Sequence, residues 1–97
     1  MQFLIQFEVF DTFITAEEIR ALRGRIGERI GKIMETGKVV ASGTWCDARG
    51  GFFLVNADSS EEVFDMLGGT LLDSCHIKTQ PVQSFDNLKK FFAQNPI

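Results

Sequence analysis

The sequence predicts a small α+β domain with the order β-α-β-β-α-β and one further helix at its C-terminal end. Three observations indicate this order. Four stretches have the apolar alternation or β-branched and aromatic content of strands, and two stretches with helical periodicity separate them. Each helical stretch begins at a capping signal. Pro81 lies in the last strand stretch, and proline is tolerated on an edge strand but not in a central one.

The first strand covers residues 2–10, and its side chains alternate between two faces. One face is wholly apolar, and the other mixes apolar residues with Gln6 and Glu8. A strand of this kind is at least partly buried on both faces, which is typical of the centre of a sheet. The apolar face consists of Phe3, Ile5, Phe7 and Val9.

The first helix is predicted to begin at Thr15, with Glu18 completing a capping box, and to end at Gly37. Its apolar stripe consists of Ile19, Leu22, Ile26, Ile30 and Ile33. Three glycines on one side of the helix, at positions 24, 27 and 31, indicate a close approach to the sheet or to a partner helix.

The second half of the chain supplies the other elements. Strands are predicted at 38–46, 51–57 and 75–83, with a hairpin loop at 47–50. Ser59 and Glu62 form a second capping box. The helix that follows buries Val63, Phe64 and Leu67 and stops at Gly68-Gly69. A short terminal helix from Ser84 has the apolar side Phe85, Leu88, Phe91 and Phe92.

This order is the ferredoxin-like arrangement, a four-stranded antiparallel sheet with strands one and three at its centre. Both long helices then pack on one face. Apolar residues remain on the other face, namely Leu4, Phe10 and either Phe52 with Leu54 or Phe53 with Val55. An exposed patch of this size is unusual for a monomer. We therefore expect the terminal helix to cover part of the face and a second copy of the chain to cover the rest, which would enclose a cavity.

Length, composition and charge limit the classes of function that the protein can have. Ninety-seven residues suit one domain, residues 1–97. The net charge is −3, and the basic residues of the first helix alternate with glutamates, which argues against nucleic-acid binding. No apolar run has the ~20 residues of a membrane span. The N-terminus has the pattern of a strand and not of a signal peptide, and two widely spaced cysteines favour free thiols in the cytoplasm.

The sequence resembles the dimeric α+β barrel superfamily, and within it the muconolactone isomerase-like proteins. The Phe-rich first strand, the long helix ending at Gly37, the strand with Trp45 and the segment 54–67 carry this resemblance. It implies a homodimer or an assembly of dimers, no metal or cofactor, and small organic ligands bound against the sheet. Activities in the superfamily include lactone isomerisation by proton transfer and cofactor-free oxidation of aromatic polyketides. The segment 68–72 departs from the isomerase pattern.

Isolated polar residues on the apolar second face are the candidate site. Glu8 and His76 are the candidate catalytic acid and base, because a carboxylate and an imidazole can transfer a proton next to a carbonyl group. Lys78 and Arg49 are candidates for holding an anionic group. The remaining candidate substrate-binding residues are Gln6, Trp45 and Asn56.

The hypothesis is therefore a small-molecule enzyme or binder that resembles muconolactone isomerase and acts on an unsaturated lactone or a related organic acid. Two alternatives remain open. One is a non-catalytic dimerising or ligand-binding module, whose second face would be packed shut. The other is a cofactor-free monooxygenase, which needs a roomier apolar cavity.

Overall fold

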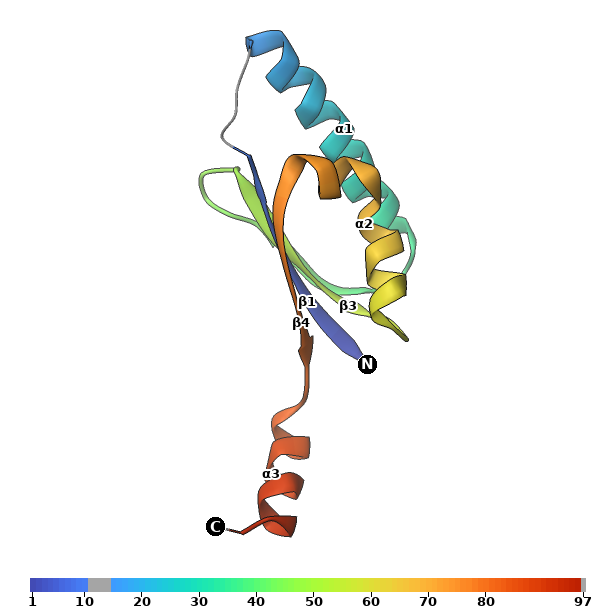
Figure 1. Cartoon of the computed structure of the whole chain (residues 1–97), viewed down its shortest axis with the longest axis vertical. Helices are drawn as coiled ribbons and strands as arrows, with labels where there is room; N and C mark the ends of the chain where they lie inside the picture. Colours follow the sequence, from blue (N-terminus) through green and yellow to red (C-terminus); the bar gives the residue numbers. More distant parts are fainter. Residues whose placement is uncertain (11–14, 97) are drawn as a thin grey trace.

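The computed structural model describes residues 1–10 and 15–96, and this part of the chain forms a four-stranded antiparallel sheet and three helices (Figure 1). The elements follow the predicted order and are compatible with the ferredoxin-like arrangement. They are β1 (Gln2–Val9), α1 (Ala16–Glu35), β2 (Val39–Thr44), β3 (Gly50–Asn56), α2 (Ser60–Ser74), β4 (Cys75–Val82) and α3 (Phe85–Gln94).

The order of strands across the sheet is β2-β3-β1-β4, which confirms that the first and third strands are central. Pro81 lies on the edge strand β4, as predicted. The helices α1 and α2 lie on one face of the sheet, and the other face, here called the open face, is not covered by either (Figure 1). The open face carries Phe52 and Leu54, because Phe53 and Val55 are buried on the helix side.

The core lies between the helices and the central strands. Ile5 and Val55 are fully buried there, as is Leu71 of α2. Burying an aliphatic side chain of this size contributes about 1.5–3 kcal/mol. The two predicted caps of the long helices are present, since the Thr15 and Ser59 hydroxyls accept hydrogen bonds from the backbone N–H of residues 18 and 62. These contacts fix where each helix begins and therefore which face it turns to the core.

The helical backbone of α2 is interrupted at Gly68, as predicted, but a second helical segment follows directly. It continues to Ser74 after a kink at Gly68, where φ is +64°. Carbonyl groups at the end of a helical segment lack partners within the helix. The Arg29 guanidinium provides the missing hydrogen-bond donors. Its Nη2 donates to the Asp65 carbonyl at 2.8 Å, and its Nε donates to the Met66 carbonyl at 2.9 Å. Glycine and arginine together thus replace a helix end by a bend.

Two other predictions about the helices are wrong. Phe64 was expected on the buried side of α2, but 61% of its surface is exposed, and Met66 occupies the buried side instead. The glycines at 24, 27 and 31 do not approach the sheet, because a Cβ atom at any of them would meet no atom within 4 Å. The alternative of a close approach to a partner helix stays a prediction.

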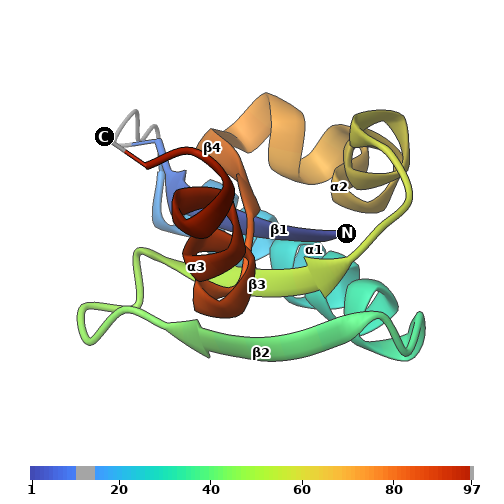
Figure 2. The same cartoon turned by 90° about the horizontal axis from the view of Figure 1, so that it is seen from below.

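The terminal helix α3 does not cover its own sheet. It continues beyond the end of β4, away from the body of the molecule (Figure 1), and therefore stands in front of the sheet when the molecule is seen from below (Figure 2). Phe85, Phe91 and Phe92 are 82%, 56% and 53% exposed, and Leu88 is 43% exposed. The apolar side of α3 therefore has no partner among the described residues of the same chain.

Replacing Gly68 by alanine should destabilise the protein by at least about 1–2 kcal/mol, the cost of a left-handed backbone at a residue with a Cβ atom. The new Cβ would also lie 2.8 Å from Cζ of Arg29 and disturb its hydrogen bonds. Urea denaturation followed by circular dichroism measures the loss. Gly69→Ala is the matched control, because its nearest neighbour is 3.8 Å away. Equal stability of the two variants would contradict the role assigned to the kink.

Candidate functional site

The predicted site residues lie in two different places, and only some of them share a face. Antiparallel pairing of β1 with β4 sets Glu8 directly opposite His76 and Gln6 directly opposite Lys78. Directly opposed residues have Cβ atoms about 4.5–5.5 Å apart, so each pair is within reach of a shared ligand. Trp45 lies beside them, at the end of β2. The structure thus brings together five of the seven candidate residues, Gln6, Glu8, Trp45, His76 and Lys78.

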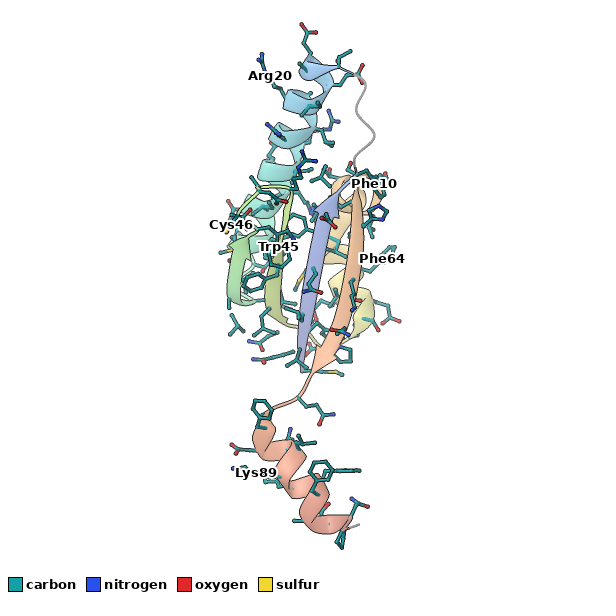
Figure 3. The ribbon with its side chains drawn as sticks, turned by 90° about the vertical axis from the view of Figure 1, so that its left-hand side faces the viewer. Phe10, Arg20, Trp45, Cys46, Phe64 and Lys89 are labelled. Atoms are coloured by element: carbon teal, nitrogen blue, oxygen red, sulfur yellow. The ribbon has the colours of Figure 1, made fainter. Side chains whose placement is uncertain are left out.

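These five residues border a shallow hollow of about 290 Å³ on the open face, here called the open-face site. Figure 3 looks onto this face, with Trp45 over the strands and Phe10 at the end of β1. Two ring contacts shape it. The Phe10 ring contacts the His76 ring edge-on, with 4.4 Å between the ring centroids, and the Trp45 ring stacks on Phe52 with 6.0 Å between the centroids. Glu8, His76 and Lys78 are exposed to solvent in the single chain.

Asn56 and Arg49 are not part of the open-face site. Asn56 pairs with Gln2, whereas Gly50, at the other end of β3, pairs with Glu8. Six residues of strand separate them, which is about 20 Å. Arg49 precedes β3 and borders a cavity on the opposite side of the sheet. Both residues are therefore remote from the candidate acid and base.

A larger cavity than the open-face hollow lies on the helix side, between α1 and the strands β2 and β3. It has a volume of about 670 Å³, within the 300–1,000 Å³ that is usual for small-molecule sites. We call it the helix-side cavity. Its apolar wall includes Phe7, Val9, Ile19, Leu22, Ile26, Ile30, Met34, Phe52 and Phe53.

Small side chains on β2 leave this cavity unfilled. Beside the cavity, the helix-facing residues of β2 are Ser42 and Thr44, whereas Val39 at the other end of the strand packs on the core. Their hydroxyl groups are held within the protein, Ser42 Oγ 3.7 Å from Sδ of Met34 and Thr44 Oγ1 donating to the Gly50 carbonyl at 3.0 Å. On the opposite wall, Gly27 of α1 adds no side chain. Small residues on both walls thus contribute to the space.

Arg23 and Arg49 are the charged residues among those described as lining the helix-side cavity, and these described lining residues include no acidic side chain. Two guanidinium groups at an apolar cavity favour a ligand that combines an apolar body with an anionic group. Arg49 was predicted as an anion-binding residue, but on the other face. Sequence reasoning missed the remaining lining residues, although the small residues of 42–44 were a visible signal.

Among the residues that the structure describes, no group of three or more His, Cys, Asp or Glu could hold a metal ion. In the same part of the chain, no helix is both long and apolar enough to cross a membrane. No model of a known protein family and no curated protein matches the chain.

The two cysteines are free and differ in their surroundings. Cys46 is exposed near the hairpin, and Cys75 is buried at the start of β4. Burial disfavours the thiolate and so raises the pKa of the Cys75 thiol above its ordinary value. Cys75 is 4% exposed and belongs to the core, so it is a packing residue and not a nucleophile.

The raised pKa of Cys75 predicts a loss of stability at alkaline pH. The folded state binds the thiol proton more tightly than the unfolded state does. The stabilisation is therefore complete below the ordinary thiol pKa of about 8.5 and is lost as pH rises through the raised value. Urea midpoints between pH 7 and 10.5 should fall more steeply for the parent protein than for Cys75→Val. Cys46→Ser should keep the parent slope, and parallel curves for parent and Cys75→Val would refute the linkage.

Proposed function

We propose that the protein binds a small organic anion, with the apolar part of the ligand in the helix-side cavity and its anionic group at Arg23 and Arg49. The single observation that carries this proposal is a cavity of about 670 Å³ whose described lining includes two arginines and no acid. Burying an anion costs several kcal/mol unless opposite charges compensate for lost hydration. Arginine suits this compensation, because its planar group binds a carboxylate through two parallel hydrogen bonds.

The walls favour aromatic or alicyclic ligands over strongly polar ones. The Phe7 and Phe53 rings stack 5.7 Å apart at the floor of the cavity. The hydroxyls of Ser42 and Thr44 already donate within the protein, so they offer oxygen acceptors and not free protons. This cavity also has the apolar room that the monooxygenase alternative requires, which makes oxygen consumption with a bound polycyclic substrate worth assaying.

Binding should be lost when the cavity is filled from α1. We expect the parent protein to bind medium-chain or aromatic carboxylates, such as decanoate or anthracene-carboxylate, at least tenfold more tightly than the neutral amides of the same shape. Gly27→Leu should weaken binding at least tenfold, because its side chain would enter the cavity. Isothermal titration calorimetry measures both effects.

Gly31→Leu is the matched control for this substitution. It lies one turn further along α1, also in open space, but does not line the cavity. Both substitutions should raise helix stability by up to ~1 kcal/mol, so a change in folding cannot imitate a change in binding. No binding of any carboxylate, or equal losses in both variants, would refute the proposed function.

A second candidate function is favoured by the pairing of Glu8 with His76. We propose that these residues transfer a proton on an unsaturated lactone or related acid, in the manner that the resemblance to muconolactone isomerase implies. Lys78, opposite Gln6, would hold the substrate's anionic group. Both reacting residues are exposed in the single chain, so this function requires the open face to be enclosed by a second copy, as in a dimeric α+β barrel.

Lactone isomerisation tests this second candidate directly. Glu8→Gln and His76→Ala should each lower kcat by 10²–10⁴-fold, the usual contribution of a general acid or base. Asn56→Ala, on the same face but at the far end of the sheet, should leave kcat unchanged. An absorbance assay with unsaturated lactones measures these rates. Absence of turnover in the parent protein would exclude the lactones tested as substrates and remove this candidate.

A further inference from the structure

The terminal helix α3 is well formed at both ends, but no other helix or strand of the described part of the chain packs extensively against it. The Ser84 hydroxyl accepts a hydrogen bond from the Asn87 backbone N–H, and Asn95 Nδ2 donates to the Phe91 carbonyl. Isolated helices shorter than ~12–15 residues are marginal in water, and α3 has 10 residues. It therefore needs a packing partner to remain helical.

The apolar residues of α3 form one continuous side. Positions 85, 88, 91 and 92 fall within about a third of the helix circumference at 100° per residue. The opposite side carries Asn87, Lys90 and Gln94, and Figure 3 shows the labelled Lys89 on the helix surface. This amphipathic pattern predicts that α3 lies on an apolar surface with its polar side in water.

Its own sheet is not that surface. Only Gln83 and Ser84 connect β4 to α3, and the helix points away from the end of the sheet (Figures 1 and 3). The longest extent of the molecule is consequently 57 Å, against 26 and 21 Å in the other directions. An apolar surface in need of cover nevertheless exists on every chain, because the open face carries Leu4, Phe52, Leu54 and Val82.

We propose that α3 is an exchanged arm that packs on the open face of a second copy of this chain. Each chain offers one arm and one face, so a two-fold pair satisfies both surfaces of both chains without any other protein. The arm would lie along the partner's open face and contribute its phenylalanines to the cover over the partner's Glu8–His76 region. This inference goes beyond ligand binding in the helix-side cavity, which α3 does not line.

The area available is sufficient for a stable dimer. A fully buried phenylalanine removes roughly 150–250 Å² of surface from water. Scaled by the exposed fractions of Phe85, Leu88, Phe91 and Phe92, the apolar surface that one arm can bury is on the order of 400 Å². Two arms and the two faces they cover then bury on the order of 1,600 Å², the standard size of a specific interface. A single arm bound to an unrelated protein would bury half of this and would leave the open face uncovered.

The first experiment measures the mass of the full chain by light scattering during size-exclusion chromatography. The parent protein should be a dimer at micromolar concentration. Leu88→Glu and Phe92→Glu should each weaken the dimer at least tenfold, because each would bury a carboxylate in an apolar contact. Gln94→Glu, on the polar side of the same helix, should remain a dimer. A monomeric parent, or dimers unaffected at positions 88 and 92, would overturn the proposal.

The second experiment asks whether the arm reaches the partner's sheet. In a Cys46→Ser background, chains with Leu54→Cys are mixed with chains that carry a cysteine at 88, 91 or 92. Oxidation should join the two kinds of chain in at least one of these mixtures. Placing both cysteines in one chain distinguishes the alternatives, since an arm folded back on its own sheet would form an intramolecular disulfide and overturn the exchange. Absence of an intermolecular crosslink at all three positions would also overturn the exchange.

Circular dichroism and urea denaturation accompany both experiments. The residues of α3 lie outside the core, so variants at 88 and 92 should keep the folded β-sheet domain even as monomers. Ligand binding in the helix-side cavity should persist in these monomers. Failure of the arm proposal and failure of the binding proposal are therefore separate results.

Discussion

The packing of α1 against α2, and not flat on the sheet, determines most of what is distinctive in this structure. Arg29 joins the two helices, because its guanidinium binds the carbonyls exposed by the kink at Gly68. Ile26 and Ile33 reach the core beside this contact. The helix α2 lies over β4 and β1, so α1 is left to cover β3 and β2 and reaches them incompletely. The helix-side cavity is the space that remains.

The sequence predicted the elements well, since their signals are local. Alternation placed Phe3, Ile5 and Phe7 on the helix side, and hydroxyl caps gave the start of each helix. The predictions from the sequence failed where a contact between distant residues determines the local structure. The Gly-Gly pair interrupts the helix at Gly68 as predicted, but Arg29, 39 residues earlier, stabilises a bend there, and the second helical segment that follows was not predicted. The direction of α3 after Val82 depends on what it packs against, which no local pattern encodes.

The same distinction applies to the candidate sites. Strand alternation was enough to place Glu8, His76 and Lys78 on one face, because register follows from period-two geometry once the strand order is known. It could not locate the larger cavity, whose space depends on the packing of α1 against α2 and on the small residues that face α1. Arg49 shows the limit most clearly. Its residue type suggested anion binding, but only the hairpin geometry decides which side of the sheet it borders.

The pair β2–β3 links the two faces of the molecule. Phe52 borders the helix-side cavity and also stacks with Trp45 on the open face, while its neighbour Phe53 belongs to the core. The outer strand β2 is held by β3 alone and has a register shift between Val39 and Ala41. An arm or a second sheet packed on the open face would restrict the motion of β2 and β3 from the face opposite the cavity. Since β2 and β3 form one wall of the cavity, such packing would also stabilise the shape of the proposed ligand site.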